Sequence, residues 1–289
     1  MKNNVSTDSL HAIRQLTGIK RVLLLVFLVV TVLMMIIPLS LILPPGVDWQ
    51  LAYRPAALAV LAGKSPFSVD GFFNAPWAIL VHLPFAFFPE EIGRAALFVI
   101  GFIAYGLVAY RFGAKPIAFI AFMISPPVLH GLLNSNIDWL ALLGFILPPQ
   151  LGLFFVVIKP QVGIGVMVFW LYQAWKEGGW RQVLRVFSPI TIVLLISFLM
   201  FGVWPLRFQQ EVSLWWNASL WPVSIPVGLV LLAYSIRSKE MRYAIPAGPC
   251  LSPYVLLHSW VGALLPLLTL QAETVIAVAG LWLVVLLRI

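Results

Sequence analysis

Long runs of apolar residues dominate this chain, without the alternation of apolar and polar positions that marks a half-buried strand. The runs cover roughly residues 22–43, 76–89, 94–110, 116–133, 139–157, 160–175, 186–203, 222–236, 244–257, 261–270 and 274–287. Such runs favour helices, and a helix satisfies its own backbone hydrogen bonds in hydrocarbon. We therefore predict an all-α fold: a polytopic transmembrane bundle of about ten helices, forming a single domain over residues 1–289.

The first run, 22–43, is long enough to cross a bilayer core, which takes about 20 residues. A Pro-Pro-Gly sequence follows it, with no small-residue cleavage site, so we expect an uncleaved first helix rather than a signal peptide. Several later runs are shorter than a span and are broken by prolines such as Pro160 and Pro266. Short, broken helices are typical of segments that line a cavity inside a bundle.

Composition supports the membrane class, because 62% of the residues are hydrophobic and only 10% are charged. Soluble domains average about 45–50% apolar and 25% charged residues. We expect an integral, multi-pass protein of a bacterial plasma membrane, with membrane lipids as partners. The net charge of +8 comes without a basic run interleaved with aromatics, so we expect no nucleic-acid partner. Cys250 is the one cysteine, which excludes an internal disulfide.

The distribution of basic residues orients the chain, because Lys and Arg concentrate in cytoplasmic loops. If run 76–89 stays at the outer surface, 12 of the 18 Lys and Arg lie inside and 6 outside; if it crosses, the split is 8 and 10. The first arrangement fits the rule. It predicts a cytoplasmic N-terminus and a long outer loop, 44–93, with a surface helix at 50–62 and an interfacial helix at 76–89.

Asp48 is the sharpest candidate for chemistry on the predicted outer side, one turn beyond the first membrane helix and beside Trp49. One interpretation is a solvated loop acid or a cap for the helix near Gln50. The other is a general base at the lipid–water boundary, which removes a proton from an acceptor hydroxyl while a phosphate leaving group departs.

Lys159 and Asp138 are the other charged candidates on that side. Lys159 is either a snorkelling interfacial lysine or a cation for a lipid-linked phosphate. Asp138 begins a helix, so it is either a dipole partner or a second carboxylate that orients the acceptor or joins Asp48 in binding Mg²⁺ or Mn²⁺. No metal or nucleotide motif is present, so we expect no organic cofactor. The scattered histidines are expected to be packed or interfacial: His82, His130 and His258.

Three motifs in order carry a family resemblance. Residues 48–67 place an acid, then Tyr53, then a small-residue helix and a Gly-x-x-Pro-Phe sequence, where the family usually has Tyr at the last position. Residues 133–136 are similar to an Asn-x-Asn element, and 158–161 match a Lys-Pro element. Over residues 20–200 the chain resembles the bacterial polyprenyl-phosphate-mannose-dependent mannosyltransferase-like family of the GT-C glycosyltransferase superfamily, of which it would be a short or divergent member.

The resemblance implies a GT-C-like helical bundle with a catalytic outer loop. It also implies inverting transfer of a sugar, such as mannose, from a polyprenyl-phosphate donor to a lipid or glycan acceptor outside the cytoplasm. Asp48 would be the base, Lys159 and Arg54 the contacts to the donor phosphate, and Asp138 the second cavity acid. The remaining substrate-binding candidates are Tyr53, Asn134, Asn136 and Gln161.

Two other functions fit parts of the sequence. The reduced length and imperfect motifs fit a non-catalytic GT-C-like subunit of a larger complex, which would have a membrane protein partner. The broken helices fit a lipid or solute transporter, although the chain shows no internal repeat.

Overall fold

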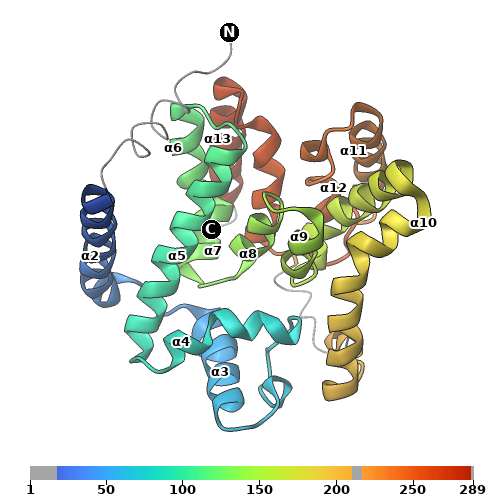
Figure 1. Ribbon diagram of the computed structural model, residues 1–289. Helices are drawn as coiled ribbons and strands as arrows, with labels where there is room; N and C mark the ends of the chain where they lie inside the picture. The colour runs from blue at the N-terminus through green and yellow to red at the C-terminus, as the bar shows by residue number, and fades with distance from the viewer. Residues whose placement is uncertain (1–17, 210–216, 288–289) are drawn as a thin grey trace.

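The computed structural model describes residues 18–209 and 217–287 (Figure 1). Within these ranges the ordered elements are all helical and no strand occurs, which confirms the all-α prediction. The α-helices are α2 (Gly18–Ile42), α3 (Arg54–Leu61), α4 (Leu83–Ala86), α5 (Glu90–Arg111), α6 (Pro116–Met123), α7 (Pro126–Leu133), α8 (Asp138–Gly144), α9 (Pro149–Val156), α10 (Pro160–Phe201), α11 (Ile225–Ser238), α12 (Ala247–Cys250) and α13 (Gln271–Leu287). The π- and 3₁₀-turns are η1 (Trp49–Tyr53), η2 (Pro66–Ser68), η3 (Pro76–Val81), η4 (Trp204–Gln209), η6 (Met241–Tyr243) and η7 (Leu257–Leu267).

Prolines determine where many of these helices begin. Pro116, Pro149 and Pro160 occupy the first turn of α6, α9 and α10, where a missing backbone N–H costs no hydrogen bond. A proline cannot continue the preceding helix, so the apolar runs are divided into short pieces. For example, α8 has 7 residues and α9 has 8. At 1.5 Å per residue such helices are roughly 10–12 Å long, far short of the ~30 Å hydrocarbon core.

The candidate membrane spans are fewer than the apolar runs of the sequence. Among the described residues, α5 and α10 are long and apolar enough to cross a membrane, and the α6–α7 pair, bent by 45°, makes a third if it counts as one span. The prediction of about ten spanning helices is not confirmed. Short apolar helices pack against these candidates, for example α9 against α10 and α8 against α5.

Helix α10 consists of two arms. Its 42 residues include Gly178 and Gly179, whose backbone angles are not helical; Gly179 has φ 60° and ψ −149°, a conformation that glycine adopts without a Cβ penalty. The break falls between the predicted runs 160–175 and 186–203. Figure 1 shows the first arm leaving the centre of the bundle toward the upper right and the second arm descending along its edge.

The outer loop predicted at 44–93 forms a compact cap at one end of the bundle. Run 76–89 is divided into η3 and α4, which have 6 and 4 residues and are too short to span. The indole N–H of Trp77 donates to the Phe154 carbonyl of α9 at 2.8 Å. In Figure 1, α3 and α4 lie together at the lower end, opposite the bend of α10.

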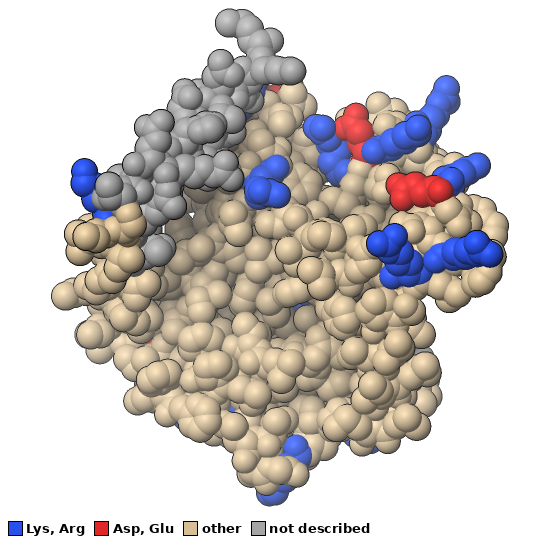
Figure 2. Space-filling model, viewed as in Figure 1, with Lys and Arg blue, Asp and Glu red and all other residues tan. Residues whose placement is uncertain are grey.

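Basic side chains gather at the other end of the molecule. Figure 2 shows Lys and Arg crowded around the bend of α10 and the end of α11, whereas few are visible at the lower end. The exposed basic residues of this upper group are Lys176, Arg181, Arg185, Arg237, Lys239 and Arg242. Among the described residues, exposed basic side chains are therefore concentrated at the end that holds the bend of α10, away from the end that holds the outer loop.

Candidate functional site

The loop between α7 and α8 brings the two predicted acids to one asparagine. The backbone N–H of Asp48 donates to the Asn134 carbonyl at 3.0 Å. The Asp48 carboxylate accepts a hydrogen bond from the Asn136 amide nitrogen at 2.5 Å. The side-chain oxygen of Asn136 accepts the backbone N–H of Asp138 at 3.1 Å. Asn136 therefore bonds to the side chain of Asp48 and to the backbone of Asp138. Asn134 bonds to Asp48 through its own backbone carbonyl, and its side chain caps the C-terminal end of α7 by donating to the His130 carbonyl.

Two local features allow Asp48 to approach this loop. A Cβ at Gly46 would collide with the Ser135 hydroxyl, so any larger residue there would require Ser135 to move. Trp49 is fully buried; it packs where Gly93 of α5 has no side chain and donates its indole N–H to the Glu90 carbonyl at 2.9 Å. Asp48 makes no side-chain capping bond to the following helix, so the capping interpretation is wrong.

Lys159 forms an ion pair with Asp138. Its ammonium lies 3.4 Å from Asp138 Oδ1, and both side chains are buried. His258 Nε2 lies 3.9 Å from Asp138 Oδ2. Asp138 is the first residue of α8 and Lys159 directly precedes α10. Helices α8 and α10 are in contact, which brings the two side chains together. A buried charge needs such a partner, so the lysine is not the snorkelling residue that its sequence context allowed.

Tyr53 connects the outer loop to both acids. It is buried, stacks on His82 with ring centroids 4.4 Å apart, and accepts a long 3.4 Å hydrogen bond from Asn74. Burial, and then the charges of Asp48 and Asp138, raise the pKa of the Tyr53 hydroxyl well above its usual range. Tyr53 is therefore neutral at physiological pH and keeps its hydroxyl hydrogen.

His82 is also neutral, for a related reason. Burial lowers its pKa to about 3, although its hydrogen bond to the Ala78 carbonyl opposes the shift. The Nδ1–H donates to that carbonyl at 3.0 Å, and Nε2 is buried without a hydrogen-bond partner. His82 therefore supports the ring of Tyr53 and carries no charge.

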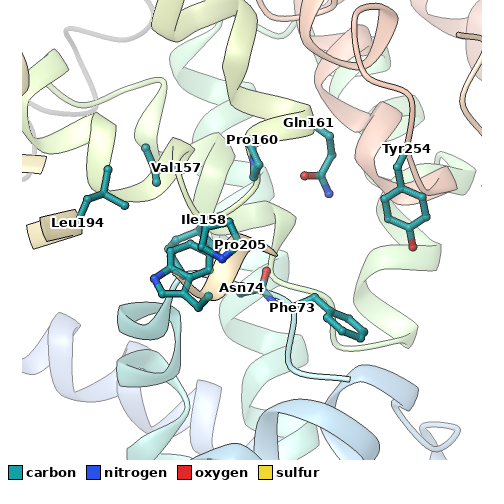
Figure 3. A pocket seen from close by; sticks show the side chains of 11 residues that line it. Phe73, Asn74, Val157, Ile158, Pro160, Gln161, Leu194, Pro205 and Tyr254 are labelled. Atoms are coloured by element: carbon teal, nitrogen blue, oxygen red, sulfur yellow. The ribbon is translucent and has the colours of Figure 1, made fainter. Parts of the chain in front are cut away.

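An apolar cavity of about 340 Å³ opens beside this group (Figure 3). Its walls are mostly apolar or aromatic, and they come from the outer loop, the α9–α10 junction, the second arm of α10 and η4. The lining residues are Phe73, Asn74, Ala75, Val157, Ile158, Pro160, Gln161, Leu194, Trp204, Pro205 and Tyr254. Figure 3 shows the amides of Asn74 and Gln161 directed toward the same space, with Tyr254 at its side.

Tyr254 links this cavity to the base candidate. Burial, and then the charge of Asp48, raise the pKa of its hydroxyl. Asn74 lines the cavity and also binds Tyr53. Tyr254 and Asn74 are therefore the cavity residues that relate it to Asp48 and Tyr53. Sequence reasoning selected Gln161 for this site but missed Asn74 and Tyr254, because an amide and a phenol in apolar surroundings carry no spacing motif.

The remaining predicted residues have weaker positions. Arg54 starts α3 directly after Tyr53 and is half-buried, with its Nε buried and lacking a hydrogen-bond partner. No group of three or more His, Cys, Asp or Glu side chains among the described residues is placed to hold a metal ion. Asp48 and Asp138 already have Asn136 and Lys159 as partners, so this donor set does not support the Mg²⁺ or Mn²⁺ hypothesis.

Two histidines that looked unrelated in the sequence meet in the structure. His130 in α7 and His258 in η7 lie 128 positions apart, yet their Nδ1 atoms are 3.1 Å apart. Helix α7 packs along η7, which brings them together. No local pattern could have revealed this pair.

Comparison of the chain with protein-family models, with curated proteins and with solved structures finds no match in any of the three. The GT-C resemblance therefore stays a prediction that rests on the motifs at 48–67, 133–136 and 158–161. Function has to be argued from the geometry of the site.

Proposed function

We propose that this chain is a membrane glycosyltransferase that moves a sugar, such as mannose, from a polyprenyl-phosphate donor to a lipid or glycan acceptor outside the cytoplasm. One observation carries the proposal: a half-buried carboxylate, Asp48, is held by Asn136, and its charge acts on Tyr254 in the wall of an apolar cavity. A polyprenyl phosphate has an apolar chain, which the apolar cavity suits, and an anionic head, for which Lys159 and Arg54 are the proposed cations. The bundle supplies the hydrocarbon environment that such a donor requires.

In this proposal Asp48 is the general base. It is half-buried rather than sealed, so an acceptor hydroxyl can reach it, and Asn136 fixes one of its oxygens. A positioned base of this kind takes the proton of the attacking hydroxyl as the phosphate leaves. Tyr53, Asn74 and Gln161 add neutral hydrogen-bonding groups around the sugar, and the neighbouring cavity holds the start of the lipid chain.

The donor phosphate needs a cation, and Lys159 is the first residue proposed for this role. Lys159 is neutralised by Asp138 at 3.4 Å. It can bind the leaving phosphate, as we propose, only when it exchanges this partner. Arg54, half-buried at the start of α3, is the second cation proposed for this role.

A non-catalytic subunit is the second candidate, and the Asp138–Lys159 pair favours it. If the pair is permanent, Lys159 stabilises the bundle and does not bind phosphate. The chain would then bind a lipid or a membrane protein partner in the same cavity without transferring sugar. The effect of changing Asp48, argued in the Discussion, separates the two functions.

Orientation is testable by labelling of single cysteines. We propose that the end carrying the outer loop faces away from the cytoplasm, since the crowded basic end should be cytoplasmic. In a Cys250→Ser background, a membrane-impermeant maleimide added to intact spheroplasts should label Lys64→Cys. It should label Arg185→Cys only after permeabilisation. Both native side chains are exposed, so the opposite labelling pattern would refute the orientation.

Filling the cavity should weaken donor binding. Ile158 is buried in the cavity wall, so Ile158→Trp puts a larger side chain into the cavity. We expect the Kd for polyprenyl-phosphate mannose to rise about tenfold or more, a loss of ~1.4 kcal/mol of binding free energy. Binding can be measured by native mass spectrometry of the purified chain. Leu151→Trp, at an exposed position on α9, is the matched control. Equal binding by both variants, each with wild-type thermal stability, would contradict the assigned lipid site.

A further inference from the structure

His130 and His258 share one proton between two nitrogens. Their Nδ1 atoms are 3.1 Å apart, and the rings stack with centroids 5.3 Å apart and 20° between planes. In a hydrogen bond between two imidazole nitrogens, one carries the hydrogen and the other a lone pair. One of the two Nδ1 atoms is therefore a donor and the other an acceptor.

Asp138 decides which histidine is which. The Nε2 atom of His258 is buried and faces Asp138 Oδ2 at 3.9 Å. A lone pair at this position would face a negative oxygen, whereas an N–H would face it favourably. We therefore assign the hydrogen of neutral His258 to Nε2, which leaves its Nδ1 as the acceptor. His130 then donates its Nδ1–H, and its own Nε2 carries a lone pair.

This arrangement has a direction, from the half-exposed His130 through buried His258 to fully buried Asp138. We propose that the chain binds a proton at Asp138, and that His130 and His258 carry this proton inward from water. The inference does not depend on sugar transfer, because it rests only on the contacts among these residues.

The transfer conserves both protons and charges. A proton from water binds His130 Nε2 as the His130 Nδ1–H passes to His258 Nδ1. The Nε2–H bond of His258 breaks, and an O–H bond forms on Asp138. Both imidazoles end neutral: His130 then carries its hydrogen on Nε2, and His258 carries its hydrogen on Nδ1. The 3.9 Å step between His258 and Asp138 is longer than a hydrogen bond, so the proposed transfer requires a small rotation of one of these side chains.

Other ionisable groups surround the acceptor on all sides. Lys159, before α10, is ion-paired with Asp138, and Asp48, before η1, lies across Asn136. The buried Tyr105 hydroxyl of α5 has no hydrogen-bond partner within residues 18–209 and 217–287. A proton on Asp138 would remove the negative charge that holds Lys159. Proton uptake would therefore leave the Lys159 ammonium without its counter-charge, so the protonation state of Asp138 sets whether Lys159 is available to an anion.

Histidine NMR of the full chain in lipid nanodiscs tests the assigned hydrogen bond. With ¹⁵N-histidine at neutral pH, we expect His258 to show a protonated Nε2 and a bare Nδ1, and His130 a hydrogen-bonded Nδ1–H. His130→Gln and His258→Gln assign the signals by loss. His82, bonded to Ala78, is the internal reference. A hydrogen on His258 Nδ1, or no coupling between the two rings, would overturn the relay.

Infrared difference spectroscopy after a downward pH jump tests where the proton goes. We expect the carbonyl stretch of a protonated carboxylic acid to appear, and to be absent from Asp138→Asn. His130→Gln should slow its appearance by about tenfold or more, since a positioned proton-transfer group is lost. His82→Gln should leave the rate unchanged. Proton delivery to this acid would be refuted if the band persisted in Asp138→Asn, or if His130→Gln left the rate of its appearance unchanged.

Discussion

Asp48→Asn should reduce sugar transfer by roughly 10²- to 10⁴-fold, the usual contribution of a positioned general base. The amide keeps the size of the side chain and can still bond to Asn136, so the loop should keep its geometry. It cannot accept the proton of the acceptor hydroxyl. Transfer would be measured with purified protein in proteoliposomes, as the movement of labelled mannose from polyprenyl phosphate to extracted membrane lipids or glycans.

Asp70→Asn is the matched control, because Asp70 belongs to the same outer loop but is exposed. It should transfer sugar at the wild-type rate. If Asp48→Asn transfers as well as Asp70→Asn, the base assignment is wrong. If the wild-type protein itself shows no transfer but copurifies with a stoichiometric membrane partner, the subunit function is supported instead.

Asp138→Asn should destabilise the protein by about 3–5 kcal/mol, the cost of leaving one member of a buried ion pair without its partner. The Lys159 ammonium would remain buried with a neutral amide where the carboxylate was. Unfolding in detergent micelles, followed by denaturant or heat, measures the change in free energy of unfolding. This is the largest stability effect that we expect from a single substitution in the site.

The double variant Asp138→Leu/Lys159→Met should recover most of that loss, because replacing both charges with apolar groups removes the uncompensated charge. The exposed pair Arg242–Glu240, at 2.7 Å, is the control. Breaking it with Arg242→Gln should change stability by less than about 1 kcal/mol. A double variant no more stable than Asp138→Asn would show that the pair does more than neutralise charge, for example by fixing how α8 meets α10.

Sequence patterns were sufficient for the helical class and for the main boundaries. The Pro-rich sequence 44–45 ends the first helix, and the gap between runs 160–175 and 186–203 marks the Gly178–Gly179 break. The number of spans could not be read in the same way. The composition of an apolar run of eight residues, such as Leu151–Ile158, does not distinguish a short buried helix from part of a membrane span. Only its neighbours decide between them.

The arrangement of the candidate residues was predicted in part, for a similar reason. Motif order placed Asp48, Asn136 and Asp138 on one side, and the structure brings them together through a single amide. Charge partners could not be assigned, since Lys159 could pair with either acid and the choice depends on where α8 and α10 meet. The His130–His258 contact requires two segments that are distant in sequence, and neither has a local feature that distinguishes it from an ordinary packed histidine.

The second arm of α10 forms part of the cavity wall through Leu194, while neighbouring side chains on its other face are exposed, among them Ile192, Leu195 and Leu199. Only one thickness of helix therefore separates the cavity from surrounding hydrocarbon. A long-chain ligand can approach sideways, without first dissolving in water. Its occupancy should then follow its mole fraction in the bilayer rather than its aqueous concentration, so dilution with added lipid would empty the site while dilution with buffer would not.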